Sequence, residues 1–181
     1  LIAPTSNNNM IGGTGDNYAN LFNAIIPYVE EHFNVSTDKM ERAFAGLSMG
    51  SMNTQNIINS KPVDAEGNPV DKFGYYGPWS GGCSVTATAP GIEYAHILFA
   101  GGYDDFGNPS EATVNNLKNS GVYCLYKGVS GAHDFSTWCQ MFRIYCDEYL
   151  WKAWMFGDGE EPADPYADLQ PGPNVIADPE S

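Results

Sequence analysis

Residues 43–50 read Ala-Phe-Ala-Gly-Leu-Ser-Met-Gly, and this stretch decides the fold class. Its apolar first half, residues 43–47, predicts a short strand, and residues 49–59 predict a helix. Ser48 falls at the turn between them, inside a G-x-S-x-G motif. A serine hydroxyl is a weak nucleophile unless a tight turn holds it beside a base, and this turn requires small residues two positions before and after the serine. The motif therefore makes Ser48 a candidate nucleophile.

The predicted helix after Ser48 adds a second chemical feature. The first N–H groups of a helix have no partners within it and carry partial positive charge. The backbone N–H of Met49 is therefore expected to face the oxygen on which negative charge develops during attack on a carbonyl. It is the one oxyanion-hole donor that the sequence assigns.

Ser48 requires a base, and the chain has three histidines. His32 is expected at the surface near the end of an early helix. His96 falls within a predicted strand over residues 94–100, where its ring would be packed or hydrogen-bonded in the sheet. His133 lies in a loop after another predicted strand. In hydrolases with a G-x-S-x-G turn the histidine comes last in the chain, in a loop at the carboxyl end of a strand. His133 is the predicted base.

The acid that orients the base should lie between Ser48 and His133, after a strand. Gly101-Gly102-Tyr103-Asp104-Asp105 follows the predicted strand over residues 94–100, so Asp104 and Asp105 both qualify by position. Asp134 is next to His133 in the chain. A neighbour in sequence rarely meets the ring well, so Asp134 is expected to cap the following helix or to belong to the loop.

Strands and helices alternate along most of the chain. This order predicts an α/β fold with a mostly parallel sheet and helices on both faces. Residues 1–157 are interpreted as one domain, and residues 158–181 as an acidic, Pro-rich tail or linker. Further strands are predicted over 73–76 and 122–127, and helices over 18–33 (with a kink, or as two helical pieces, because of Pro27), 110–120 and 136–155.

The charge and the cysteines narrow the function classes. The chain has 8 basic and 22 acidic residues and a net charge of −14, which disfavours nucleic acid and anionic membrane surfaces as partners. The cysteines contain no C-x₂-C pair, so free thiols are expected and no metal or cofactor is predicted. They are Cys83, Cys124, Cys139 and Cys146.

Three segments, residues 25–30, 42–50 and 131–138, together resemble carbohydrate esterase family 1, the feruloyl esterase and acetyl xylan esterase group of α/β-hydrolases. The resemblance runs over about residues 1–156. It implies that Ser48 is the nucleophile, that His133 is the base, and that the last residue of the G-x-x-D turn, Asp105, is the acid. It also implies that N-terminal strands of this fold, with the loop giving the second oxyanion-hole donor, lie upstream of the residues given.

The resemblance implies a secreted serine esterase that removes feruloyl or acetyl groups from plant polysaccharide such as xylan, in a longer chain with further modules. Alternatives are an acyltransferase or another esterase of the same branch, mycolyltransferase-like or enterochelin esterase-like, and a silent carbohydrate-binding homologue. Trp79, Tyr103 and Phe106 are expected to contact substrate. Phe135 and Trp138 lie near them, but packing in the core is equally expected for Phe135 and is favoured for Trp138.

Overall fold

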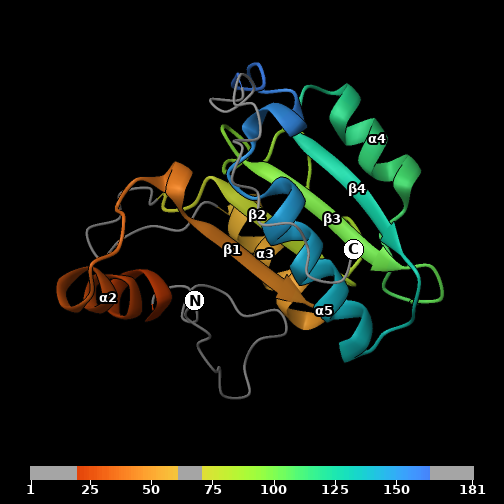
Figure 1. Ribbon diagram of the computed structural model, residues 1–181, viewed down its shortest axis with the longest axis horizontal. Coiled ribbons are helices and arrows are strands. Elements are labelled where there is room, and N and C mark those ends of the chain that lie inside the picture. Colours follow the sequence, from red (N-terminus) through yellow and green to blue (C-terminus); the bar gives the residue numbers. More distant parts are fainter. Residues whose placement is uncertain (1–19, 61–70, 164–181) are drawn as a thin grey trace, which may run out of the picture.

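The computed structural model describes residues 20–60 and 71–163, and its centre is a four-stranded parallel sheet (Figure 1). The strand order is β1-β2-β3-β4, so each strand lies beside the next one in the chain. This arrangement agrees with the predicted parallel sheet. Its strands are β1 (Ala43–Leu47), β2 (Tyr75–Trp79), β3 (His96–Gly102) and β4 (Cys124–Val129).

Helices cover both faces of the sheet, as the sequence predicts. Helix α5 (Phe135–Ile144) crosses the front of the sheet in Figure 1, and α3 (Met49–Ser60) lies behind it. Helix α4 (Glu111–Asn119) packs with the α3 side. The strands alternate between two apolar clusters, because successive side chains point to opposite faces. On β3, for example, Ile97 and Phe99 join the cluster with α3 and α4, whereas Leu98 and Ala100 join the cluster with α5.

The N-terminal helical segment is formed in two pieces, as Pro27 predicts. A π-helical turn, η1 (Leu21–Ile25), runs into α2 (Ile26–His32), with Pro27 in the first turn of α2. The missing N–H of a proline is tolerated there, because the first N–H groups of a helix have no partner within it. A short 3₁₀ turn, η2 (Lys39–Glu41), then leads into β1.

The predicted end of the second strand at residues 77–78 is wrong. Strand β2 continues through both residues to Trp79, and Pro78 lies opposite Gly46 of β1. A proline removes one donor from a strand, but the backbone hydrogen bonds resume directly afterwards. Ser48 N donates to the Trp79 carbonyl at 3.0 Å, and Ser80 N donates to the Ala100 carbonyl at 2.8 Å. One lost donor therefore does not end the strand.

The single long helix predicted over residues 136–155 is also wrong. Helix α5 passes into a π-helical turn, η3 (Tyr145–Tyr149), and a separate 3₁₀ turn, η4 (Ala153–Phe156), follows. Between them, Trp151 has the left-handed φ of 67°. The reversal lets Trp151 pack edge-on against Tyr75, with their ring centroids 5.2 Å apart. Tertiary packing thus overrides the helical periodicity.

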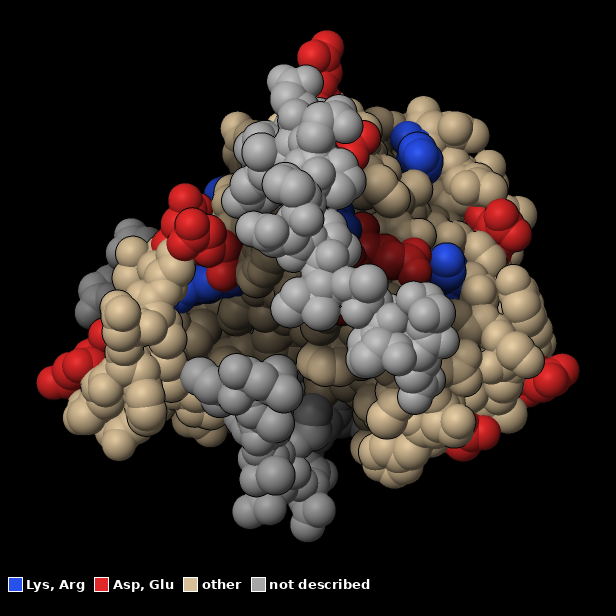
Figure 2. All heavy atoms as spheres, viewed as in Figure 1, with Lys and Arg blue, Asp and Glu red and all other residues tan. Residues whose placement is uncertain are grey.

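Some expectations fall outside the described residues. These include residues 1–19 of the predicted domain and residues 164–181 of the acidic tail. Within the described residues, no helix has the length and apolarity needed to cross a membrane. Basic side chains are few and scattered on the face drawn in Figure 2, where acidic ones are more numerous.

Candidate active site

The turn between β1 and α3 holds Ser48 in a strained position. Ser48 has a φ of +53°, in the left-handed region that costs a non-glycine residue about 1–2 kcal/mol. A Cβ on Gly46 would lie 2.3 Å from the Gly50 carbonyl oxygen, so the turn closes only with glycine at position 46. A Cβ on Gly50 would meet nothing within 4 Å, so the expected need for a small residue there is not steric. Met49 opens α3 directly after the turn.

The loops after β3 and β4 are joined to each other by backbone contacts. Tyr103 N donates to the Val129 carbonyl at 2.9 Å, and Asp104 N donates to the Gly131 carbonyl at 3.0 Å. A Cβ on Gly102 would lie 2.2 Å from the same Gly131 oxygen, so glycine is required for this approach. The joined loops carry the candidate acid and the candidate base toward each other.

Ser48, His133 and Asp105 form one hydrogen-bonded chain. The Ser48 Oγ lies 2.9 Å from His133 Nε2, and His133 Nδ1 lies 2.8 Å from Asp105 Oδ1. With Nδ1 protonated toward the carboxylate, Nε2 is left to accept the serine proton. Of the two adjacent aspartates, Asp105 is buried and bonded to His133, whereas Asp104 is exposed. The structure thus brings together the three residues proposed for catalysis.

The surroundings of Asp105 keep its carboxyl ionised. Burial by itself would raise the pKa of Asp105, but the neighbouring Ser80 side chain and the hydrogen bonds from Gly107 N and His133 lower it below its ordinary value. The Gly107 N–H donates to Asp105 Oδ1 at 2.7 Å. An ionised partner stabilises the imidazolium that forms when His133 takes a proton.

Asp134 caps the helix after His133, as the sequence predicts. Its carboxylate accepts a hydrogen bond from Thr137 N at 2.9 Å at the start of α5. This bond is the main cause of the lowered pKa of Asp134. The cap fixes where α5 begins, and therefore where the preceding loop places His133.

The aromatic residues predicted to contact substrate are placed differently from one another. The prediction that Trp79 contacts substrate is wrong. Its side chain points to the α5 face of the sheet, where it is 3 % exposed and its ring packs edge-on against Tyr145. Tyr103 is exposed. Phe106 is 88 % exposed and stacks on the His133 ring at 4.2 Å between centroids. Phe106 is therefore available at the site, and Trp79 is not.

Two further residues support the site and were not predicted to do so. The Trp138 indole N–H donates to Ser80 Oγ at 3.0 Å, and the Trp138 ring packs edge-on against His133. Phe135, by contrast, is exposed. The signal for Ser80 is weak in the sequence, since a serine in a glycine-rich loop after a strand is common.

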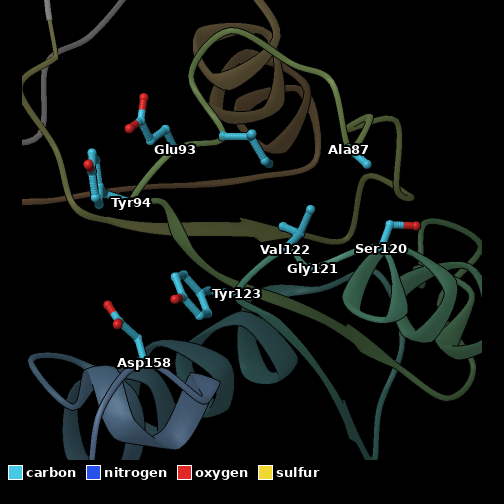
Figure 3. A pocket seen from close by; sticks show the side chains of 9 residues that line it. Ala87, Glu93, Tyr94, Ser120, Gly121, Val122, Tyr123 and Asp158 are labelled. Atoms are coloured by element: carbon cyan, nitrogen blue, oxygen red, sulfur yellow. The ribbon is translucent and has the colours of Figure 1, made fainter.

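The pocket shown in Figure 3 lies away from this chain of residues. Its lining combines residues 92–94 and 120–123 with Ala87 and Asp158. None of Ser48, Asp105 or His133 lines it.

Within the described residues, no group of three or more His, Cys, Asp or Glu side chains is arranged to hold a metal ion. The four cysteines, all described, are free thiols.

Comparison with solved structures identifies the fold of the chain. No family model matches the chain. A ferulic acid esterase superposes with a TM-score of 0.52 at 19% identity, covering 77% of this chain and 60% of that one. A feruloyl esterase module from Clostridium thermocellum, a serine mutant complexed with sinapinate, gives a TM-score of 0.52 at 16% identity, with coverage of 84% and 62%. The chain has the α/β-hydrolase fold.

The chain is also similar in sequence to a protein described as a feruloyl esterase. An endo-1,4-beta-xylanase/feruloyl esterase of Xylanibacter ruminicola is 33% identical over 121 residues, which are 65% of this chain and 15% of that protein. The resemblance to the feruloyl esterase group is thereby confirmed. The chain spans a small part of this curated relative and about three fifths of the two solved structures.

Proposed function

We propose that this α/β-hydrolase is a serine esterase that removes feruloyl or acetyl groups from plant polysaccharide such as xylan. The observation that carries the proposal is the hydrogen-bonded chain Ser48–His133–Asp105 at a strained strand-to-helix turn. A relative described as a xylanase/feruloyl esterase supports the substrate class. Because such substrates are polymers outside cells, secretion is part of the proposal.

The proposed reaction follows from these contacts. Ser48 Oγ attacks the ester carbonyl carbon while His133 Nε2 takes its proton. Asp105 holds the imidazolium, and the Met49 N–H stabilises the oxyanion. The tetrahedral intermediate collapses, and His133 returns the proton to the departing sugar alcohol. Water, activated by His133, then attacks the acyl-enzyme, releases the carboxylic acid and restores Ser48.

The test is hydrolysis of p-nitrophenyl acetate and methyl ferulate by the folded chain and by Ser48→Ala. We expect Ser48→Ala to lower kcat by a factor of at least about 10³, because the nucleophile is removed. Ser84→Ala is a matched control. It also deletes a serine hydroxyl, but this hydroxyl donates to the Gln55 side chain and is not bonded to His133. Equal rates for Ser48→Ala and the parent chain would contradict the proposal. The ratio of the two substrates measures the acyl preference.

A further inference from the structure

The carboxylate of Asp105 is satisfied at one oxygen and open at the other. Oδ1 accepts hydrogen bonds from His133 Nδ1 and Gly107 N. Oδ2 is buried, and within residues 20–60 and 71–163 it has no hydrogen bond of ordinary length and angle. Leaving a buried polar atom unpaired destabilises the folded chain, and more so when the group is charged. A donor beside Oδ2 would therefore matter to the carboxylate that orients His133.

Ser80 is pressed against the turn that carries Asp105. It follows the last residue of β2, is buried, and has a left-handed φ of 54°. A Cβ on Gly107 would lie 2.3 Å from the Ser80 carbonyl oxygen. Gly82 N donates to the Gly107 carbonyl at 2.9 Å. These contacts hold residues 80–82 directly against residues 105–107, so the place of the Ser80 side chain is fixed by backbone.

The Ser80 hydroxyl carries one proton, and its contacts indicate which group accepts that proton. The Trp138 indole N–H donates to Ser80 Oγ at 3.0 Å. An indole N–H only donates, so it occupies a lone pair and leaves the single hydroxyl proton free for an acceptor. The Ser80 side chain is also the first of the groups that lower the pKa of Asp105 against the opposing effect of burial. Together with the unpaired Oδ2 on the adjoining turn, this favours the Asp105 carboxylate as the acceptor.

We propose that Ser80 is a positioning residue: its hydroxyl, oriented by Trp138, donates to Asp105 Oδ2 and fixes the plane of the carboxylate that His133 Nδ1 requires. The effect on rate rests on the proposed esterase function. With Oδ2 free, the carboxylate could rotate about its last side-chain bond and lose the alignment of the Oδ1 bond to His133. Trp138 contacts this arrangement at two points. Its indole N–H donates to Ser80 Oγ, and its ring packs edge-on against His133 at 5.0 Å between centroids.

The kinetic test removes the Ser80 hydroxyl in two ways. Ser80→Ala deletes it, and Ser80→Gly deletes it while fitting the left-handed backbone without strain. We expect each to lower kcat by about tenfold with little change in KM, the effect of one charge-assisted hydrogen bond. Ser84→Ala, in the same loop, should leave kcat unchanged. Parent-like kcat in folded Ser80→Gly would overturn the proposal.

A double-mutant cycle separates orientation from general loosening. If Trp138 acts through Ser80, then Trp138→Phe lowers kcat, and the Ser80→Gly/Trp138→Phe pair loses less than the product of the two separate losses. Losses that multiply would show that Trp138 acts through another route and would overturn the stated role of the indole.

A measurement on the resting protein keeps this proposal separate from the esterase proposal. The proton between His133 Nδ1 and Asp105 should give a downfield proton resonance that disappears in His133→Gln. We expect Ser80→Gly to shift or broaden it, and Ser84→Ala to leave it in place. An unchanged resonance in Ser80→Gly overturns the positioning role. If the parent chain hydrolyses no ester, the esterase proposal fails, and the resonance still decides the role of Ser80.

Discussion

Two histidines in this molecule each pair with an aspartate, at opposite ends of the same strand, β3. His133 meets Asp105 beyond the carboxyl end, and His96, the first residue of β3, meets Asp158 at 2.9 Å. The His133 side chain is 19% exposed, and its second nitrogen faces Ser48 Oγ. The His96 side chain is fully buried, and its second nitrogen faces the Gly74 carbonyl at 3.1 Å.

The group that faces the second ring nitrogen decides what each histidine can do. The two partners of His96 are a backbone carbonyl and a carboxylate, so neither of its ring nitrogens faces a hydroxyl that could serve as a nucleophile. Stacking against Tyr75 and Tyr123 further holds the His96 ring. His133 instead has one nitrogen committed to Asp105 and one directed at a hydroxyl. A His–Asp pair alone is therefore not a sign of catalysis.

The largest expected effect comes from exchanging each histidine for glutamine. His133→Gln should lower kcat/KM by a factor of at least about 10³ with little change in Tm, because it removes the base from a partly exposed loop. His96→Gln should instead lower Tm by roughly 5–10 °C and keep kcat/KM per folded molecule, because it disturbs a buried hydrogen-bonded ring. Ester hydrolysis and thermal unfolding measured on both variants check this. Loss of activity in folded His96→Gln would contradict a purely structural role for His96.

A somewhat smaller contrast is expected at the two aspartates. Asp105→Asn should lower kcat by roughly 10³–10⁴-fold, because the amide no longer stabilises the imidazolium and favours the wrong tautomer. The Asp158 side chain is 38% exposed, and an asparagine there can still accept from His96. Asp158→Asn should leave kcat unchanged and shift Tm slightly. Similar kinetic losses in both variants would mean that Asp158 also supports catalysis, and would contradict its purely structural role.

The smallest effect concerns pH and stability. The pKa of Asp105 is lowered in the folded chain, so its contribution to stability is present above the ordinary aspartate pKa of about 3.9 and is lost as pH falls through the lowered folded value. The Tm difference between the parent chain and Asp105→Asn should therefore shrink as pH falls below about 4. Thermal unfolding followed across that range checks the sign. A difference that grows on acidification would contradict it.

The sequence predicted the strand-to-helix turn, the parallel sheet and the order of the candidate residues, because each depends on local patterns. Strand β1 and the start of α3 were placed to the residue. The choice of Asp105 over Asp104 followed only from the family resemblance. Position alone left both open, since the two residues differ in burial and in contact with His133, which only the folded chain shows.

The errors came from packing between distant segments. Trp79 was assigned to the substrate pocket because it ends a strand at the correct edge, but its side chain enters the cluster under α5. The break at Trp151 arises because that ring packs on Tyr75, about seventy-five positions earlier in the numbering. Ser80 carries no motif, and its role depends on a partner 58 positions away, Trp138. Such contacts exist only in the folded chain.

Covalent labelling with a fluorophosphonate probe, with the modified residue located by mass spectrometry, tests most directly whether His133 activates Ser48. A serine activated by a histidine reacts with such a probe, whereas an ordinary hydroxyl does not. We expect labelling at Ser48 in the parent chain and in His96→Gln, and none in His133→Gln. Folded parent chain that remains unlabelled, or equal labelling in His133→Gln, would contradict that activation.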